Sequence, residues 1–477
     1  MENLKELFRQ LIHTEPAAVV KIDGSGSNRC YYKMLSEDGR TIIGTVGNDV
    51  DENKAFLSIG KHLREKGLPV PEVYSVSDDK MTYLQEFISD DSLYMRLTKA
   101  RTSGDYQPED IALLDKVMRL LGDIQVLGAQ GLDWSSCYPE ETFTSRAVIS
   151  DLNYFRYYFL KPSGIEFNEN RLMDELEVFR DDLLAMFDLS GFMYRDFQAR
   201  NVMIRDEEPW FIDFQGGRRG PLLYDLVSFV WQARATYPEE LREHLIDVYF
   251  EHLSELMTFD ETKARRDIAS FRLFRALQVL GAYGFRGRVE RKTHFLMSIP
   301  AALVNLEELL DCEDIPWGRY GYFREVLREL IAAERASHLP DFDGLTVTVM
   351  SFSYTRGIPY DAQNGGGYVF DCRYVHNPGR YEEYKHSTGM DDDVIQFLDT
   401  QSEMPKFMEN VYAFTDPHIE VFLRRHFTNL MVCFGCTGGQ HRSVYGAEHL
   451  AAHIRSKYPG VRVHLVHREQ GVDEIIS

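Results

Sequence analysis

Two short stretches in the middle of the chain decide its fold, Phe192–Asn201 (FMYRDFQARN) and Trp210–Gln215 (WFIDFQ). Their spacing fits the phosphoryl-transfer pattern H-R-D-x-x-x-x-N followed by D-F-G. Tyr194 stands where His is usual, and Gln215 stands where Gly is usual. We interpret both stretches as loops that follow short apolar strands.

The residue types in these loops match the chemistry of phosphoryl transfer. An Asp on a tight loop after a strand accepts the proton of an attacking hydroxyl, a role that the pattern gives to Asp196. Asn201 lies five residues further on and is expected to face the same metal and phosphate cluster. Asp213 is expected to hold Mg²⁺ between the phosphates of ATP. The sequence thus predicts Asp196, Asn201 and Asp213 as catalytic residues, and Asn201 and Asp213 as metal ligands.

The totals describe an ordinary globular protein with an acidic surface. The 477 residues exceed what one core supports, so at least two domains are expected. A net charge of −22 argues against nucleic acid or an anionic membrane as partner. Six scattered Cys, no apolar run of spanning length and no recognisable signal sequence predict a cytoplasmic protein without disulfides. The sequence leaves the oligomeric state open.

Residues 17–22 and 30–35 are predicted strands joined by a Gly/Ser-rich loop. Such a loop either is a plain hairpin turn or folds over nucleotide phosphates with its backbone amides. Because it precedes the catalytic pattern, we predict the second role. The expected phosphate-binding residues are Gly24, Ser25, Gly26, Ser27, Asn28 and Arg29.

The third predicted strand, 40–46, lacks the Lys that a protein kinase presents to the phosphates. Arg29 or Lys33 is a candidate for the missing charge, and Glu52, on a predicted helix over 51–66, is a candidate to orient it. The alternative for Glu52 is a favourable charge at a helix N-terminus. The adenine ring is expected at the connector formed by Gln85, Glu86 and Phe87.

Downstream of residue 110, apolar residues recur at helical spacing. Predicted helices cover 110–127, 169–186, 225–235, 239–256, 262–285 and 295–311. We therefore predict an α+β two-lobed, protein-kinase-like domain over residues 1–335. Its small lobe covers about 1–90 and its large lobe about 91–335.

Residues 15–325 resemble the aminoglycoside-phosphotransferase/choline-kinase family, and within it the anomeric kinases of N-acetylmuramate and N-acetylglucosamine. The resemblance rests on 26–32 (GSNRCYY), 67–73 (GLPVPEV), 194–201, 213–215 and 220–225. The Gln after Asp-Phe and the absent third-strand Lys also occur in those sugar kinases.

This resemblance assigns further roles. It implies that Asp196 is the base, that Asn201 and Asp213 hold Mg²⁺, and that Asp225 supports the catalytic loop. Arg218 and Arg219 are candidates to meet a substrate carboxylate such as the lactyl group of N-acetylmuramate; the alternative is that they are solvated surface residues.

A linker, 336–344, leads to a separate α/β domain over 345–477 with a mainly parallel sheet. Predicted strands cover 345–352, 368–373, 430–435 and 461–468, with a helix over 444–457. The glycine loop between strand and helix is predicted to bind an anion at the helix N-terminus.

The glycine loop also contains the C-x₅-R-S pattern of cysteine phosphatases, from Cys436 to Ser443, which leaves a phosphatase and a purely structural turn as alternatives. Gly435 replaces the His of those enzymes, and no general-acid loop is evident. A zinc site at Cys433 and Cys436 is rejected because no further ligand pair completes it.

The second half also resembles the RapZ C-terminal domain, over residues 345 to about 470, without the Walker-type domain that precedes it in RapZ. The matching segments are 351–359, 370–378, 388–389, 435–444 and 467–468. In that family the domain senses glucosamine-6-phosphate. The implied phosphosugar site consists of Arg356, Asp371, Arg373, Cys436, Thr437, Gly438, Gly439, Gln440, His441, Arg442, Ser443, His467 and Arg468.

The sequence as a whole predicts an ATP- and Mg²⁺-dependent amino-sugar kinase fused to a domain that binds a hexosamine phosphate. Two other readings stay open. One is a kinase for an aminoglycoside or another small alcohol. The other is a non-catalytic sensor of nucleotide and phosphosugar.

Overall fold

The fold is described from a computed structural model that places all residues except 23–28, 337–341, 343, 360–365 and 477. The chain divides into two compact units. The first comprises Met1–Phe285 and Ser298–Arg335, and the second comprises Arg286–Met297 and Ala336–Ser477. None of the described helices combines the length and the apolar character that crossing a lipid bilayer requires.

The first unit begins with a strand-rich small lobe. Its five-stranded antiparallel sheet has the order β1-β2-β3-β5-β4. The strands are β1 (Ala18–Ile22), β2 (Cys30–Leu35), β3 (Thr41–Val46), β4 (Val73–Val76) and β5 (Thr82–Glu86). Helix α1 (Glu2–Ile12) buries its apolar face against this sheet. Helix α2 (Val50–Glu65) starts at Asp49, whose side chain accepts the N–H groups of the first turn.

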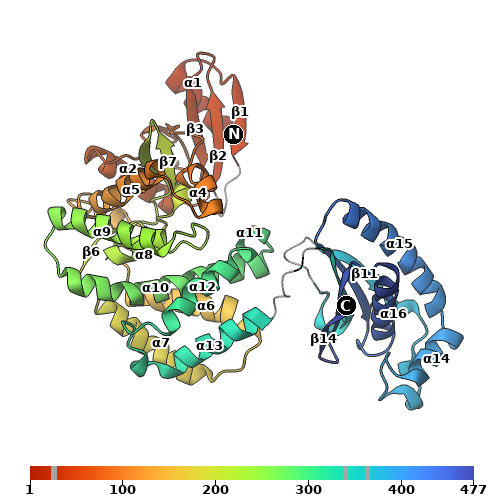
Figure 1. The fold of residues 1–477 in the computed structure, drawn as a ribbon. Helices are drawn as coiled ribbons and strands as arrows, with labels where there is room; N and C mark the ends of the chain where they lie inside the picture. The colour runs from red at the N-terminus through yellow and green to blue at the C-terminus, as the bar shows by residue number, and fades with distance from the viewer. Residues whose placement is uncertain (23–28, 337–341, 343, 360–365, 477) are drawn as a thin grey trace. The chain divides into compact units, whose positions relative to one another are not determined.

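The rest of the first unit is mostly helical, as predicted (Figure 1). Its helices are α3 (Leu93–Arg96), α4 (Thr98–Ser103), α5 (Pro108–Val126), α6 (Ser145–Phe155), α7 (Glu169–Leu184), α8 (Leu222–Val230), α9 (Glu239–Leu256), α10 (Glu261–Tyr283), α12 (Ile299–Leu310) and α13 (Gly321–Ala336). Short helical turns are η1 (Trp134–Ser136), η2 (Arg156–Leu160), η3 (Lys161–Ser163), η4 (Ala199–Asn201) and η6 (Trp317–Arg319), while η5 (Gly284–Val289) crosses from the first unit into the second. The short helix α11 (Thr293–Leu296) falls in the second unit.

Two small antiparallel sheets frame the predicted catalytic segment. Strand β6 (Ser190–Met193) pairs with β9 (Arg218–Pro221), and β7 (Val202–Arg205) pairs with β8 (Glu208–Phe211). The loop between β6 and η4 and the loop after β8 therefore both begin where strands of these two sheets end. Helix α8, buried along its whole length, lies under them and anchors the segment in the core.

The second unit contains a five-stranded sheet of order β11-β12-β10-β13-β14. The strands are β10 (Thr346–Ser353), β11 (Gly367–Asp371), β12 (Asn429–Cys436), β13 (Arg462–His467) and β14 (Val472–Ile476). All neighbouring pairs are parallel except β13 and β14, which confirms the predicted mainly parallel sheet.

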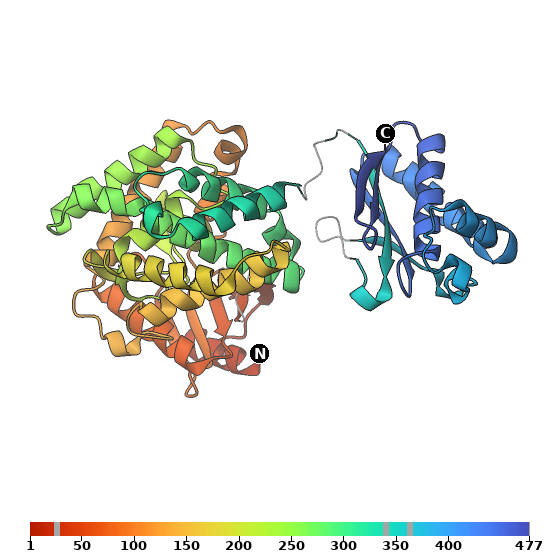
Figure 2. The ribbon, with the colours of Figure 1, turned by 90° about the horizontal axis from the view of Figure 1, so that it is seen from below.

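Helices cover one face of this sheet (Figure 2). They are α14 (Asp392–Gln401), α15 (Met404–Arg424) and α16 (Arg442–Lys457). The first two were not predicted from the sequence. Short turns complete the unit: η7 (Tyr354–Arg356), η8 (Cys372–Tyr374), η9 (Pro378–Arg380) and η10 (Glu382–Tyr384).

Candidate active site

The loop after β6 is shaped by the buried carboxylate of Asp225 on α8. This carboxylate accepts the backbone N–H groups of Tyr194 at 2.6 Å and Arg195 at 2.9 Å. The side chain of Gln125 donates to it at 3.2 Å. These bonds hold Arg195 at φ 80°, a conformation that a non-glycine residue adopts only when its surroundings impose it. Asp225 thus fixes the turn that presents Asp196.

Burial also affects the ionisation of Asp225. It raises the pKa of this carboxyl to about 7, against the opposing effect of hydrogen bonds from Tyr194, Gln125 and Arg195. Because those donors favour the ionised form, the carboxylate and the loop stabilise each other.

The three predicted catalytic residues meet at one place. The side-chain amide of Asn201 donates to the carbonyl oxygen of Asp196 at 2.8 Å and to Oδ2 of Asp213 at 3.3 Å. Asp196 is exposed to solvent, whereas Asn201 is buried. One amide therefore links the base loop to the loop after β8.

Asp213 lies in an electrostatically unfavourable position. Its pKa is raised, first because the group is buried and second because Asp196 carries a like charge nearby. A divalent cation would relieve both effects, and the oxygen donors match those that Mg²⁺ prefers. Among the described residues no group of three or more His, Cys, Asp or Glu is arranged to bind a metal. Phosphoryl-transfer sites typically hold Mg²⁺ through one or two carboxylates together with phosphate oxygens, so the residues present fit it.

The two departures from the protein-kinase pattern each have a structural role. Gln215 donates its amide to Oδ1 of Asp213 at 2.7 Å, which opposes the rise in the pKa of that carboxyl. Tyr194 is fully buried, and its hydroxyl donates to the carbonyl oxygen of Ile212. Tyr194 therefore ties the base loop to the segment between β8 and Asp213.

Arg29, one of the two candidates for the charge that the third strand lacks, is a buried residue. Arg29 is adjacent to β2, its side chain is 1% exposed, and its guanidinium lies 3.5 Å from the carboxylate of Glu52 on α2. Burial lowers the pKa of Arg29, but Tyr83, Tyr31 and Glu52 raise it overall. The positive charge of Arg29 also lowers the pKa of Asp213, which places it within electrostatic range of the metal loop.

Lys33, the other candidate, points elsewhere. Its ammonium group pairs with Asp90 and lies 4.5 Å from the centre of the Phe87 ring. At the connector, the backbone N–H of Glu86 donates to the carbonyl oxygen of Glu72 at 2.8 Å, and Gln85 is buried. Contact of Gln85, Glu86 and Phe87 with an adenine ring stays a prediction. The predicted phosphate-loop residues Gly24, Ser25, Gly26, Ser27 and Asn28 lie outside the described residues.

Arg218 and Arg219 diverge. Arg218 is buried, donates to the carbonyl oxygen of Gly216 at 3.1 Å, and has a lowered pKa because of burial and the charge of Arg195. Arg219 is exposed and lies 4.9 Å above the ring of Trp134. The structure thus gives each a protein partner, and their contact with substrate stays a prediction.

In the second unit, the glycine loop joins β12 to α16. The amide of Gln440 donates to the carbonyl oxygens of Lys385 and Ser387, and His441 contacts the carbonyl oxygen of Tyr384 at 2.8 Å. Thr437 and Gly438 are exposed, so the loop is anchored at its end and open at its tip.

The phosphatase reading is not favoured by these contacts. Cys436 is 3% exposed, and its Sγ lies 3.1 Å from Oγ of Ser443. One nitrogen of the Arg442 guanidinium donates to the carbonyl oxygens of Arg373 and Val375 at 3.0 and 2.8 Å. An arginine engaged with backbone carbonyls is poorly placed to bind a phosphoryl group.

The predicted neighbours of the loop divide into three groups. Arg356 and Arg468 both pair with Glu469, at 3.1 and 3.3 Å. Asp371 and Arg373 pair with each other at 2.6 Å. The ring nitrogens of His467 contact Ser351 and Glu448, at 2.9 Å each, and the side chain is fully buried. His467 therefore supports the packing of α16, and its contact with a phosphosugar stays a prediction.

Sequence reasoning missed several residues that organise these sites. Asp151 binds the guanidinium of Arg195 at 2.7 Å, and Gln125 contacts Asp225. Glu469 accepts the N–H of Ser353 at 3.0 Å in addition to its two arginines. Each has at least one partner far along the chain, and no local motif marks it.

Two family models match the chain. Residues 19–265, over half of its length, match the phosphotransferase enzyme family. Residues 345–471 match the RapZ C-terminal domain.

Curated relatives match only part of the chain. A nucleotide-binding protein of Geobacillus kaustophilus is 37% identical over 159 residues, which is 33% of this chain and 51% of that protein. One of Nitrosomonas europaea is 33% identical over 174 residues, 36% of this chain and 54% of that protein. The chain thus spans about half the length of these curated relatives.

Several solved structures are similar to part of this chain at low sequence identity. A choline/ethanolamine kinase family protein from Mesorhizobium loti is 13% identical, covering 69% of this chain and 98% of that one, with a TM-score of 0.45. A choline kinase from Streptococcus pneumoniae is 15% identical with the same coverages and a TM-score of 0.42. Amicoumacin kinase, solved with AMP-PNP and Ca²⁺, is 11% identical, covering 69% and 93%, with a TM-score of 0.44.

Proposed function

This chain belongs to the phosphotransferase enzyme family, and from that premise we propose that it transfers the γ-phosphoryl group of ATP to a hydroxyl of an amino sugar. The sugar is of the N-acetylmuramate or N-acetylglucosamine type, and the hydroxyl is the one at C1. The observation that carries the proposal is the Asn201 amide, which holds the Asp196 loop and Asp213 together.

In this reaction Asp196 accepts the proton of the sugar hydroxyl as its oxygen bonds to the γ-phosphorus. The bond from the γ-phosphorus to the bridging oxygen breaks, and ADP leaves with the electron pair. Asp213 and Asn201 would hold Mg²⁺, which supplies positive charge to the phosphate oxygens. The Asn201 amide donates its hydrogens to the protein, so its Oδ1 is the atom left for the metal. Arg29, oriented by Glu52, contributes the charge that the third strand lacks.

The choice of an amino sugar rests on the two departures from the protein-kinase pattern. Gln215 and the missing third-strand Lys together resemble the anomeric sugar kinases, and each departure is supported by a specific contact, Gln215 with Asp213 and Arg29 with Glu52.

ADP release by the full chain with ATP and Mg²⁺ tests this proposal across N-acetylmuramate, N-acetylglucosamine, glucosamine, choline and an aminoglycoside. We expect release that depends on the N-acetylated sugars and is abolished in Asp196→Asn. Turnover only with choline or the aminoglycoside would refute the substrate class. ADP release that is the same with and without every acceptor would refute the kinase.

For the second unit we propose that the tip of the glycine loop binds the phosphate of a hexosamine phosphate at the N-terminus of α16. Gly438 offers a direct test, because a Cβ at this residue meets nothing within 4 Å. In the full chain, Gly438→Ala is expected to bind glucosamine-6-phosphate normally. Gly438→Asp, which adds a negative charge at the loop tip, is expected to weaken binding at least tenfold by calorimetry. Equal binding by both variants would contradict the site.

The domain limits stay part of this proposal: a kinase domain over 1–335 with its small lobe to about residue 90, a linker over 336–344, and a phosphosugar-binding domain over 345–477. All six cysteines are free, which supports a location in the reducing cytoplasm.

A further inference from the structure

Helix α2 of the small lobe contacts residues on both sides of the proposed phosphate site. Near its start, Glu52 lies 3.5 Å from the guanidinium of Arg29. One turn later, the ring of Phe56 stacks on the ring of Phe214, with 4.9 Å between the ring centres and 8° between the ring planes. Phe214 directly follows Asp213 in the chain. The position of α2 therefore affects both the buried arginine and the metal loop.

The first turn of α2 is fixed by the carboxylate of Asp49. Its Oδ1 accepts the backbone N–H groups of Asp51 at 2.9 Å and Glu52 at 3.1 Å. Its Oδ2 accepts the hydroxyl of Tyr138 at 2.8 Å. These donors, and the hydroxyl most of all, hold the pKa of Asp49 below its ordinary value, which keeps the carboxylate ionised at neutral pH. A single carboxylate thus joins the start of α2 to a residue of the large lobe.

Tyr138 lies on a segment that is attached to β9 on both sides of it. The N–H of Arg219 in β9 donates to the carbonyl oxygen of Glu141 at 2.9 Å, and the carbonyl oxygen of Arg219 accepts the N–H of Phe143 at 2.7 Å. On the other side of Tyr138, the ring of Trp134 has its centre 4.9 Å from the Arg219 guanidinium. Strand β9 pairs with β6, which leads into the base loop. Tyr138 is therefore held in place relative to the base loop.

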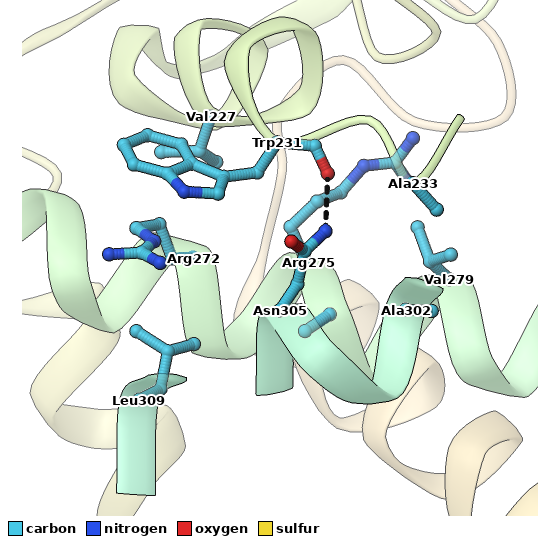
Figure 3. A pocket seen from close by; sticks show the side chains of 10 residues that line it. Val227, Trp231, Ala233, Arg272, Arg275, Val279, Ala302, Asn305 and Leu309 are labelled. Carbon is cyan, nitrogen blue, oxygen red and sulfur yellow. Dashed lines mark hydrogen bonds between the residues drawn. The ribbon is translucent and has the colours of Figure 1, made fainter. Parts of the chain in front are cut away.

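The base loop rests in turn on a helix that is anchored at both ends. Asp225, near the start of α8, accepts the N–H groups of the loop. At the other end, the carbonyl oxygen of Trp231 accepts the side-chain amide of Asn305 at 3.0 Å (Figure 3). The cavity beside this bond encloses ≈ 20 Å³, which is enough for one water molecule and far too little for a sugar ring. The base loop and α8 thus form a closely packed support for the segment of Tyr138.

Helix α2 has a second contact with the large lobe, at its opposite end. A ring nitrogen of His62 contacts the carbonyl oxygen of Gly128 at 2.9 Å. His62 lies in the last turn of α2, about 15 Å along the helix axis from Glu52. Of these two contacts, the one made by Tyr138 lies beside Glu52. The two contacts therefore allow the general docking of α2 to be distinguished from the placement of Glu52.

We infer that Tyr138 is a positioning residue for phosphoryl transfer, because its hydrogen bond to Asp49 holds the first turn of α2 where Glu52 orients Arg29 toward the phosphates of ATP. The inference rests on the proposed function and adds a contact between the lobes that the catalytic pattern does not contain. Without the hydroxyl of Tyr138, the first turn of α2 moves more freely relative to the base loop. The charge of Arg29 is then less well aligned with the phosphates.

Tyr138→Phe in the full chain tests this inference, because it removes the hydroxyl and keeps the ring. With the acceptor that best supports ADP release, we expect kcat/KM for ATP to fall about threefold to tenfold, the range that one hydrogen bond provides. KM for the acceptor at saturating ATP is expected to stay within about twofold. In the Arg29→Gln protein the same substitution is expected to change kcat/KM for ATP by less than about twofold, since the hydroxyl acts through Arg29.

Two further variants separate positioning from docking of the helix. Asp49→Ser keeps a residue type that caps helices well but is too short to reach Tyr138. We expect it to lower kcat/KM for ATP about as much as Tyr138→Phe does, and the double variant to be no slower than either. His62→Ala is the matched control, because it removes the contact at the other end of α2, and it is expected to leave kcat/KM for ATP within about twofold.

Hydrogen exchange gives a readout that does not depend on turnover. The amides of Asp51 and Glu52 are expected to exchange faster in Tyr138→Phe than in the wild-type chain, and at the wild-type rate in His62→Ala. Tm is recorded for each variant. If Tyr138→Phe does not fold, Asp49→Ser decides by the same kinetic criteria.

The remaining outcomes contradict the role of Tyr138. An unchanged kcat/KM for ATP in folded Tyr138→Phe, a loss that adds fully to that of Arg29→Gln, or an equal loss in His62→Ala would overturn it while leaving the kinase intact. If no acceptor supports ADP release, the proposed kinase fails, and calorimetric binding of AMP-PNP with Mg²⁺ decides instead. Binding weakened about threefold to tenfold by Tyr138→Phe and not by His62→Ala would support the role, and equal or absent binding would overturn it.

Discussion

Replacement of Arg29 by Gln tests whether this residue supplies the charge that the third strand lacks. The guanidinium lies 3.5 Å from Glu52, and at an effective dielectric constant of 20 this separation corresponds to about 5 kcal/mol of gross attraction. Desolvation of a side chain that is 1% exposed offsets much of that attraction. The pair with Glu52 therefore orients Arg29 and adds little net stability. The contribution of Arg29 to the transition state is a separate quantity, that of a charged hydrogen bond to phosphate, about 1.5–3 kcal/mol.

This estimate converts to a fall of roughly tenfold to a hundredfold in kcat/KM for ATP in Arg29→Gln. Arg29→Lys keeps the charge but loses the fork geometry and is expected to retain part of the activity. Initial rates of ADP release at varied ATP concentrations provide the measurement. Because the guanidinium also lies 5.6 Å from the Phe56 ring, Tm is measured in parallel to separate lost packing from lost charge.

The double variant with Glu52→Gln provides the decisive comparison. If Glu52 acts only by orienting Arg29, the double variant is no slower than Arg29→Gln alone, and the coupling energy between the two residues is about 0.5–3 kcal/mol. Fully additive losses would refute the reasoning, as would a normal kcat/KM for ATP in a folded Arg29→Gln protein.

Three further predictions concern the catalytic loops. Asp196→Asn is expected to lower kcat by about 100-fold or more while KM for ATP stays within about twofold, because a general base contributes that much to the chemical step; steady-state kinetics measure both. Because the pKa of Asp213 is raised, its carboxylate takes up a proton as pH falls at a higher pH than an ordinary Asp does. Gln215→Ala removes a donor that lowers this pKa, so the acidic limb of the kcat/KM profile is expected to move to higher pH. An acidic limb at the same pH in the variant would contradict this. Tyr194→Phe leaves the Ile212 carbonyl without its donor and is expected to lower the free energy of unfolding by about 1–3 kcal/mol, as urea denaturation would show.

The meeting of the three predicted catalytic residues at one place could be foreseen because their signal is local. Asp196 and Asn201 are five residues apart, and Asp213 follows one strand pair later, so no distant contact is needed to bring them together. The predicted fold class is confirmed. It too could be predicted from local signals, because apolar residues at helical spacing indicate the helices of the large lobe and short apolar runs indicate the strands of the second unit.

The sequence could not decide between Arg29 and Lys33. Arg29 directly precedes β2 and Lys33 lies within it, and because they are an even number of residues apart, strand alternation gives both the same face. Four residues along a strand separate them by about 13 Å, so only one can reach Glu52. The packing of α2 on the sheet determines which of the two pairs with Glu52, because it brings Glu52 beside Arg29 and leaves Lys33 with Asp90.

Helix α15 was missed because proline usually ends a helix. Pro405 lies in its first turn, where no backbone donor is needed, but Pro417 lies inside it. The buried face of this helix, which includes Phe407 and Val411, packs into the core of the second unit and outweighs the local cost. Glu469 was missed for a related reason, since its partner Ser353 is 116 residues away.

The proposed sites of both units bind anions on a strongly acidic chain, and they solve this problem differently. The first unit uses the buried Arg29, whose field is little screened by salt. The second unit uses backbone N–H groups of an exposed loop at Gly438 and the start of α16, which carry no net charge. In both cases the attraction acts over a few ångströms, while the net charge of −22 repels polyanions at longer range. The acidic surface therefore favours small phosphorylated or carboxylated ligands, which fit inside these local fields, over nucleic acids, which do not.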